Sequence, residues 1–413
     1  MVEIKEKFDK ALIPDFNIGV VGHVDHGKTT LTEALTGKWT DTHSEEIKRG
    51  ISIRLGYADM TIYKCPKCKG EKAYSLTKKC INCFSDCTPL RTVSFVDAPG
   101  HETLIATVLS GAALMDGALL VIAANEECPQ PQTIEHLTAI EIADIKKIVI
   151  VQNKIDLVTK EQAMRNYQQI KDFVKGTIAE NAPIIPVSAR MRVNLDFLLQ
   201  TIDEVMKPVE RDPKQIPKFL IARSFDVNKP GTPIEKLCGG VIGGSLVQGE
   251  LKVGDEIEIK PGIKVKEKYE PIKTKIVGIQ KAGKNLEKLE PGGLAGISTT
   301  IDPSLTKADA LSGSIASLPG KLPPSTNQLK VKVHLFKRVI GIKENFEVGH
   351  LKIGDTLLAT LATMRTTGVI STVKGDEITI NLKTPFCFEK NEKVALSKLF
   401  SGRWRLIGYG VVI

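Results

Sequence analysis

"NIGVVGHVDHGKTTLTEALTG", residues 17–37, joins an apolar run, a glycine-containing turn and a stretch of helical composition. Its centre, GHVDHGKT, matches the pattern G-x-x-x-x-G-K-[ST], in which loop N–H groups and a helix N-terminus surround nucleotide phosphates. Gly22 and Gly27 allow the backbone to wrap closely. The stretch predicts an α/β nucleotide-binding domain, with a lysine as the point charge and a threonine as a magnesium ligand. The predicted phosphate-site residues are Asp25, His26, Gly27, Lys28, Thr29 and Thr30.

A second segment, VSFVDAPGH, has the composition of a buried strand that ends at Asp97. At that position the carboxylate is expected to hold Mg²⁺ through water. Gly100 allows the backbone to approach the third phosphate and to move when that phosphate leaves. His101 follows directly and is the candidate for orienting the attacking water; capping of the next helix is the alternative.

Two further segments predict the choice of base. IVIVQNKID places Asn153, Lys154 and Asp156 just beyond a buried strand, and IIPVSA places Ser188 and Ala189 beyond the next. A carboxylate at position 156 accepts hydrogen bonds from the ring N–H and the exocyclic amine of guanine, a donor pair that adenine lacks. Backbone groups of Ser188 and Ala189 are expected near the guanine oxygen. We therefore expect GTP and GDP as ligands, and a GTPase activity.

Four cysteines follow the phosphate loop at the spacing C-x2-C-x11-C-x2-C. Four thiolates at such a spacing close one tetrahedral zinc site and leave no open position, so the expected zinc is structural. Iron remains an alternative, and Cys87 is near enough to compete as a ligand. The segment has little apolar content, so we expect zinc binding to supply its ordering energy. The predicted ligands are Cys65, Cys68, Cys80 and Cys83.

Turn-rich stretches divide the chain into predicted domains at 1–207, 208–325 and 326–413. The net charge is +9, and residues 326–413 carry 14 Lys and Arg against 7 Asp and Glu. This excess indicates a polyanionic partner for the last domain, with a solvated basic face as the alternative. The sequence shows neither a signal peptide nor an apolar run long enough to span a membrane, so we expect a cytoplasmic protein. We expect no DNA partner.

The motifs GHVDHGKTT, RGIS, DAPGH and NKID together resemble translational GTPases of the elongation factor Tu type. GGVIGGSLVQGELKVGDEIEIKPG resembles the second-domain barrel of that superfamily, and SGRWRLIGYGVV resembles the closing strand of its third-domain barrel. The resemblance implies an α/β P-loop GTPase domain with a zinc-knuckle insert, followed by two all-β barrel domains. Within the superfamily, the insert and the segments RSFDVNKPGT and IDPSLTKAD are similar to the gamma subunits of archaeal and eukaryotic initiation factor two.

That resemblance implies a GTP-dependent carrier that brings methionylated initiator tRNA to the small ribosomal subunit and releases it after hydrolysis. It also implies alpha and beta subunits as partners, and a hydrolysis rate that is slow without a partner. A selenocysteine-specific elongation factor is one alternative, although such factors continue into a further RNA-binding domain. The GTPase regulatory subunit of a sulfate-adenylylating enzyme is another, but it predicts neither the knuckle nor tRNA binding. A third alternative is that the zinc knuckle itself binds nucleic acid and the nucleotide only stabilises the fold.

The same resemblance assigns roles to residues near the phosphates. It implies that Val24 and Ile51 form an apolar gate beside the catalytic histidine, with ordinary packing as the alternative. Ser52 occupies a switch position where the family usually has threonine as a magnesium ligand. Serine keeps the hydroxyl but loses the methyl group that restricts its rotamers. Asp25 is a candidate for binding a second cation.

Three residues are candidates for tRNA contact. Tyr57, just after the first switch, has the ring needed to stack on a terminal base, although packing on a strand is more usual for tyrosine. Arg403 and Arg405 flank Trp404 in the basic last domain and are candidates for phosphate contacts. Packing of Trp404 at a domain junction is the alternative.

Overall fold

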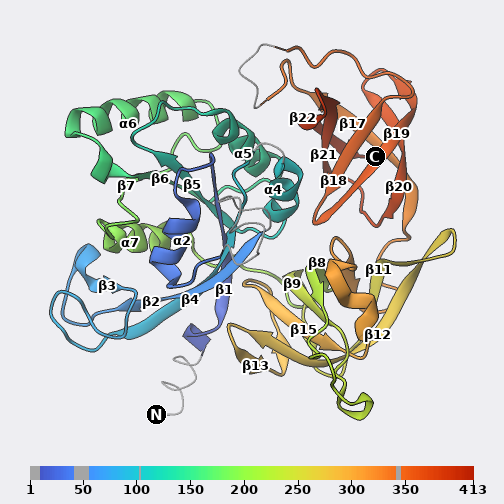
Figure 1. Cartoon of the computed structure of the whole chain (residues 1–413), viewed down its shortest axis with the longest axis horizontal. Helices are drawn as coiled ribbons and strands as arrows, with labels where there is room; N and C mark the ends of the chain where they lie inside the picture. The colour runs from blue at the N-terminus through green and yellow to red at the C-terminus, as the bar shows by residue number, and fades with distance from the viewer. Residues whose placement is uncertain (1–9, 41–54, 102–103, 341–345) are drawn as a thin grey trace. The chain divides into compact units, whose positions relative to one another are not determined.

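The computed structural model describes residues 10–40, 55–101, 104–340 and 346–413. The described residues fall into two compact units: the first holds those up to Val209 together with Ile340, and the second holds the rest. Figure 1 shows helices packed around a sheet in the first unit and strands almost throughout the second. Ile51 and Ser52 lie outside the described residues, so their predicted roles stay predictions.

The first unit contains a sheet of strand order β3-β2-β4-β1-β5-β6-β7 among the described residues. β1 pairs in parallel with β4 and β5, and the parallel pairing continues through β6 to β7. β2 and β3 are antiparallel additions at one edge. The strands are β1 (Pro14–Gly22), β2 (Gly56–Lys64), β3 (Tyr74–Ser75), β4 (Thr88–Asp97), β5 (Gly117–Ala123), β6 (Ile148–Asn153) and β7 (Ile184–Pro186).

Helices α2 and α7 bury their apolar side chains against one face of this sheet, in a core that also holds Phe16, Phe95 and Val151. α4 and α5 pack together and against β1. Local sequence explains where helices begin: α5 has a proline in its first turn, and α6 begins with a capping box made by Thr159 and Gln162. The helices are α2 (Lys28–Thr36), α4 (Ile105–Ala112), α5 (Pro131–Ile142), α6 (Lys160–Val174) and α7 (Leu195–Val205), with short 3-10 turns η1 (Gly70–Ala73) and η3 (Ile155–Leu157).

The second unit begins with a closed ring of strands in the order β11-β16-β8-β9-β15-β12, which the pairing of β11 with β12 completes. Its interior is filled by isoleucine, leucine and phenylalanine side chains from alternate strand positions. The ring strands are β8 (Lys218–Phe225), β9 (Val241–Gln248), β11 (Glu256–Val265), β12 (Lys268–Lys281), β15 (Ala295–Thr299) and β16 (Ile315–Ser317). Short elements beside it are β10 (Leu251–Lys252), β13 (Lys284–Leu286), β14 (Lys288–Leu289), η4 (Ile234–Lys236) and η5 (Pro303–Asp309).

A second closed barrel follows, with strand order β17-β20-β19-β18-β21-β22. Closure leaves no open sheet edge, which is how antiparallel barrels avoid pairing with other chains. Its strands are β17 (Thr326–Leu335), β18 (Thr356–Leu361), β19 (Met364–Lys374), β20 (Glu377–Phe386), β21 (Lys393–Phe400) and β22 (Arg403–Val412). The predicted fold class, an α/β P-loop domain with an insert followed by two barrels, is confirmed.

In the part of the chain that the structure describes, we find no helix with the length and apolar character needed to cross a membrane.

Candidate functional site: a nucleotide edge and a cysteine knuckle

The predicted nucleotide residues gather at one edge of the first sheet. β1, β4, β6 and β7 run in the same direction, so their carboxyl ends lie side by side. β1 leads into the phosphate loop, β4 ends at Asp97, and β6 ends at Asn153. The carboxyl edge of an open α/β sheet is where such folds bind ligands.

Three glycines shape the phosphate site, two in the loop and one after β4. A side chain at any of them would collide with neighbouring atoms. A Cβ at Gly22 would overlap the carbonyl oxygen of Val121. Gly27 begins α2 in the left-handed conformation, with φ of 84°. A Cβ at Gly100 would overlap Lys28 Nζ and come within 2.9 Å of Val24 Cα. The structure therefore brings the lysine and the predicted phosphate sensor together, and these glycines leave a cradle that fits phosphates.

The Lys28 side chain is buried, and its Nζ donates to the carbonyl oxygen of His23 at 2.6 Å. This bond aims the ammonium group across the loop. Thr29 and Thr30 follow in the first turn of α2 and are both half-buried. Asp25 is exposed at the loop tip, with φ of 59°.

Two buried histidines hold the loop, His26 from within it and His136 from α5. His136 on α5 accepts a hydrogen bond at its Nδ1 from the Gly22 N–H, at 2.8 Å. Burial holds the pKa of His136 well below its usual value, which keeps the ring neutral. Burial also lowers the pKa of His26 to about 3, which keeps its ring neutral. Its Nδ1–H donates to Val121 O at 3.1 Å, because a carbonyl oxygen can only accept. His26 Nε2 lies 3.5 Å from Glu126, but the neutral ring makes this contact no ion pair near pH 7.

Sequence reasoning missed His136 entirely. It placed His26 among the phosphate-site residues, whereas the structure shows that side chain turned inward with 1% of its surface exposed. No sequence motif marks a histidine that contacts the loop from a helix more than 100 positions later.

Asn153 joins the two loops of the predicted guanine site. Its Nδ2 donates to His26 O at 3.0 Å, and its Oδ1 accepts from the Ala189 N–H at 3.0 Å. Ser188 is buried and its Oγ accepts from Met191 N. Asp156 is exposed, as a carboxylate that meets a ligand base must be. Lys154 precedes it in the left-handed conformation.

Asp97 is buried at the end of β4, and its Oδ2 accepts a hydrogen bond from Thr40 Oγ1 at 2.7 Å. Thr40 is a second residue that sequence reasoning missed. Mg²⁺ prefers oxygen ligands. The buried carboxylate of Asp97 and the hydroxyl of Thr29, which directly follows Lys28, offer such ligands at this site. His101 is half-buried directly after Gly100.

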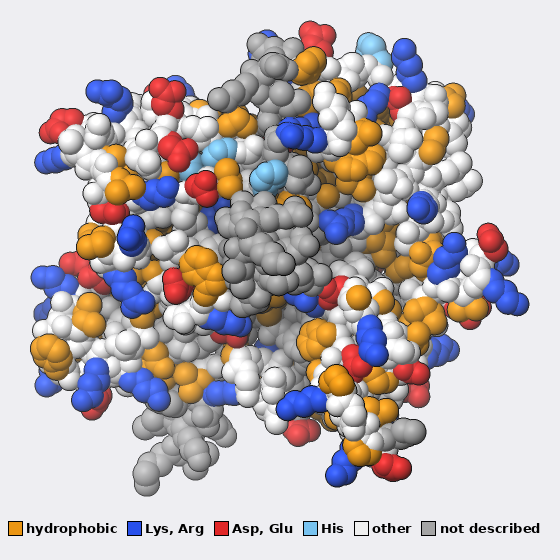
Figure 2. Space-filling view, viewed as in Figure 1, with side chains coloured by type: hydrophobic (Ala, Val, Ile, Leu, Met, Phe, Trp, Pro, Cys, Tyr) orange, Lys and Arg blue, Asp and Glu red, His pale blue; other side chains and the backbone are white. Residues whose placement is uncertain are grey.

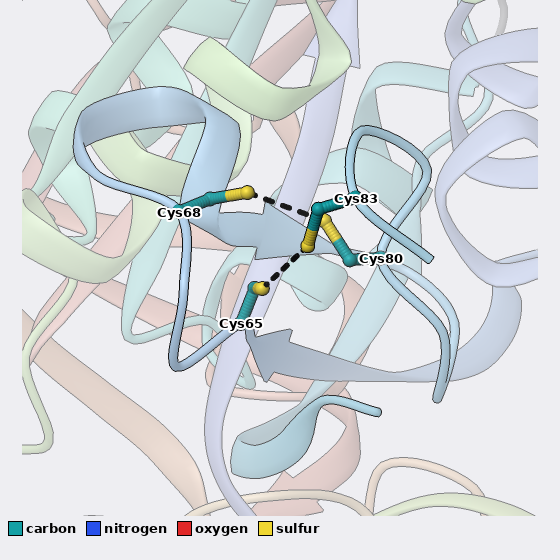
Figure 3. A group of neighbouring side chains, drawn as sticks. All are labelled: Cys65, Cys68, Cys80 and Cys83. Atoms are coloured by element: carbon teal, nitrogen blue, oxygen red, sulfur yellow. Dashed lines mark hydrogen bonds between the residues drawn. The ribbon is translucent and has the colours of Figure 1, made fainter. Parts of the chain in front are cut away.

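The four predicted zinc ligands come together on the insert. All four Sγ atoms lie within 4.8 Å of one another, with Cys65 and Cys83 at 3.4 Å and Cys68 and Cys80 at 3.7 Å (Figure 3). A tetrahedral zinc with bonds of about 2.3 Å requires sulfur atoms about 3.8 Å apart, so the cluster fits this metal. Cys87 is buried beside the cluster. Among the described residues, however, the group of sulfur atoms close enough to share one metal ion does not include it.

The tRNA candidates have mixed placements. Tyr57 lies on β2, half-buried, and its carbonyl oxygen accepts from Lys38 Nζ at 3.1 Å. Arg403 is exposed, but Arg405 is buried, with only 5% of its surface exposed. The structure therefore contradicts a surface phosphate contact by Arg405, which is buried although it shares a face of β22 with the exposed Arg403. Trp404 between them is half-buried.

Three family descriptions match this chain in order. Residues 14–208 match the elongation factor Tu GTP binding domain, 239–316 match elongation factor Tu domain 2, and 327–412 match the C-terminal domain of initiation factor eIF2 gamma. Translation initiation factor 2 subunit gamma from Methanocaldococcus jannaschii is 57% identical over 402 residues, 96% of this chain and 97% of that protein. The same subunit from Methanothermobacter thermautotrophicus is 55% identical, over 96% of this chain and 98% of that one. This chain belongs to the gamma subunits of translation initiation factor 2. It is an initiation factor GTPase.

Solved structures share the fold over almost the whole chain. A bacterial selenocysteine-specific elongation factor superposes with a TM-score of 0.72 at 26% identity, covering 97% of this chain and 58% of that one. Elongation factor SelB from Methanococcus maripaludis, bound to a GTP analogue, gives 0.71 at 21% identity, covering 97% of this chain and 79% of that one. The second likeness supports the fold alone.

Proposed function

We propose that this gamma subunit carries methionylated initiator tRNA to the small ribosomal subunit in its GTP-bound state and releases it after hydrolysis. The observation that supports the proposal most strongly is the identity above 50% with initiation factor 2 gamma subunits along nearly the whole chain. The meeting of the phosphate loop, Asp97 and the guanine motif at one sheet edge supports the nucleotide part.

The chain's own residues suggest how the nucleotide controls the carrier. Lys28 and the N–H groups of the glycine loop hold phosphate oxygens, and Asp97 with Thr29 and Ser52 offers ligands for Mg²⁺, which would neutralise phosphate charge. Gly100 has no side chain to keep it from the third phosphate, so loss of that phosphate frees its segment to move. His101 comes next and is the proposed group for orienting water, with Val24 as one side of the gate.

We expect hydrolysis by the subunit alone to be slow. The phosphate-site segments 22–30 and 97–101 contain no arginine to neutralise developing charge. A partner must therefore complete the site. The proposed partners are the alpha and beta subunits of the factor and the small ribosomal subunit, with initiator tRNA as cargo.

For the tRNA, the second barrel and its exposed Arg403 supply positive charge, and Tyr57 stays the proposed stacking residue near the first switch. Cys65, Cys68, Cys80 and Cys83 are proposed to hold a structural zinc. The proposed domain limits are those suggested by the sequence, 1–207, 208–325 and 326–413.

The nucleotide part is tested by titrating fluorescent GDP, GTP and ATP analogues into the wild-type chain and an Asp156→Asn variant. The wild type should bind GDP and GTP and reject ATP. The variant should lose guanine affinity by about 10-fold or more, because a charged hydrogen-bond acceptor is removed. Comparable ATP and GTP affinities, or an unchanged variant, would contradict the assignment.

A selenocysteine-specific factor is a second candidate because such proteins share the fold. The two functions differ in cargo, so competition between initiator methionyl-tRNA and selenocysteinyl-tRNA for the GTP-analogue form separates them. Preference for selenocysteinyl-tRNA would overturn the initiation role.

A further inference from the structure

Phe84 is in a conformation that its residue type disfavours. It follows Cys83 directly, has φ of 59°, and exposes 78% of its surface. Its N–H donates to Cys80 O at 2.9 Å, while the Cys80 N–H donates to Ser85 O at 2.9 Å, so the cysteine turn imposes this geometry. The turn after the first cysteine pair has Gly70 at the same φ of 59°. Glycine is the inexpensive residue in the left-handed region, and a bulky side chain there is strained.

Packing within the chain does not offset that strain, because the ring is mostly in solvent. The turn explains the backbone conformation but not the phenylalanine, and a strained bulky residue kept where glycine would be unstrained is an indication of function. A second apolar side chain in the same turn, Ile81, is also 66% exposed. Two exposed apolar residues three positions apart form a small contact surface.

The charge around this turn is one-sided. Lysines precede and surround the second cysteine pair, and Lys78 and Lys79 lie directly before Cys80. Figure 2 shows Lys and Arg side chains interleaved with apolar ones over this β2–β3 end of the first unit. Residues 64–88 contain only Glu71 and Asp86 as acidic residues. The lysines, all exposed, are Lys64, Lys67, Lys69, Lys72, Lys78 and Lys79. The segment stays positive even with the charge of −2 of a zinc–tetrathiolate centre.

We propose that this turn is a binding surface for unpaired RNA, with Phe84 as the stacking platform. The knuckle surface consists of Lys78, Lys79, Ile81, Asn82 and Phe84, all exposed. An exposed aromatic ring among lysines is the combination that binds single strands: the ring stacks on a base and the ammonium groups contact phosphates. A duplex hides the base faces, so the surface favours loops and single strands. Within the first unit this site is separate from the nucleotide edge, because β2 runs from Gly56, which pairs with Asp97, to Lys64 at the knuckle.

The decisive variant is Phe84→Gly. Glycine is unstrained at φ of 59°, so the variant should be at least as stable as the wild type while it loses the platform. We expect binding of a fluorescein-labelled 12-nucleotide single-stranded RNA to weaken about 5- to 100-fold, the range for losing one base–aromatic stack. Phe84→Tyr should retain the affinity. Lys78→Gln with Lys79→Gln should lower the slope of log affinity against log salt by about 1.4.

Matched controls separate this surface from other basic regions of the chain. Phe197→Ala removes another ring, 45% exposed on α7, and Lys160→Gln with Lys175→Gln removes two exposed lysines around α6. These controls should leave RNA affinity unchanged, and GDP affinity should stay constant in every variant. A 4-thiouridine RNA should crosslink within residues 78–86.

Two results would overturn the proposal. One is unchanged RNA affinity in Phe84→Gly together with crosslinks elsewhere. The other is binding of poly-glutamate as tightly as RNA, with loss of that binding in Phe84→Gly, which would assign the surface to an acidic polypeptide. Failure of this proposal leaves the carrier function intact, because that function is tested separately by the binding of initiator tRNA.

Discussion

His136 shows how one buried side chain fixes the phosphate loop. Its ring is neutral and accepts the Gly22 N–H at 2.8 Å, so the proton of the ring is on Nε2. This bond holds the last residue of β1, where the backbone must turn to surround phosphates. The contact depends on α5 lying against β1, which is a property of the fold and not of any local motif.

Replacing His136 separates the hydrogen bond from the packing. His136→Leu leaves the Gly22 N–H buried without an acceptor and should lower the free energy of unfolding by about 1–3 kcal/mol, and GDP should bind more weakly because the loop loses its support. His136→Asn places an amide oxygen near the position of Nδ1 and should retain most of the affinity. Displacement of fluorescent GDP, with thermal unfolding run in parallel, measures both effects. Equal loss in the two variants would show that the acceptor is not what matters.

At the scale of elements, the insert is attached to the first unit in two ways. The cysteine cluster closes its outer part, and Ala73 and Tyr74 at its base pack into the main core of the sheet. Tyr74 Oη also donates to Asp203 on α7 at 3.2 Å. The expectation that the segment has too little apolar content to order itself is therefore wrong for the base. It stays a prediction for the outer turns, where Ile81 and Phe84 face solvent.

Zinc removal should consequently loosen only part of the insert. Cys65→Ser with Cys68→Ser, or a strong chelator, should release one zinc per chain and make residues 66–72 and 78–86 sensitive to protease. β2, β4 and GDP affinity should be unaffected, because Tyr74 keeps its core contacts. Metal analysis and limited proteolysis with mass spectrometry test this, and Cys238→Ser, at an exposed isolated cysteine, is the control. A chain without bound metal, or a loss of GDP affinity on chelation, would contradict the account.

The sequence was most informative where chemistry is local. Phosphate-loop glycines, the Cys spacing and the guanine motif are short patterns whose geometry is set within a few residues, and the structure brings each set together. Sequence was weaker where tertiary contacts decide. The Thr40–Asp97 bond joins residues 57 positions apart, and the burial of Arg405 depends on tertiary packing around β22 that no local pattern reveals.

At the scale of the whole molecule, the buried histidines make the stability of the first unit depend on pH. The folded-state pKa values of His26 and His136 are lowered by burial, whereas an unfolded histidine titrates near 6.5. As pH falls below 6.5, the unfolded chain takes up protons that the folded chain refuses, so the free energy of unfolding decreases. The stabilisation is fully present above pH 6.5, and for His26 the loss ends near pH 3.

Between pH 6.5 and 5.5 this loss is about 1 kcal/mol for each histidine, or about 2 kcal/mol for the pair. Urea denaturation monitored within the first unit measures it, at fixed salt and without nucleotide. His136→Asn should show about half the wild-type decrease. A wild-type stability that is flat or rises over this interval would show that one or both rings are protonated in the folded state.

The carrier function is a claim about the whole chain, because it couples the nucleotide edge of the first unit to a tRNA surface. The most direct measurement is the affinity of the purified chain, with and without alpha subunit, for initiator and elongator methionyl-tRNA. Both nucleotide states, GTP analogue and GDP, must be compared at one salt concentration, since phosphate contacts make affinity depend on ionic strength. We predict tighter binding of initiator tRNA in the GTP-analogue state. Equal affinity in both nucleotide states, or no binding with alpha subunit present, would contradict the account.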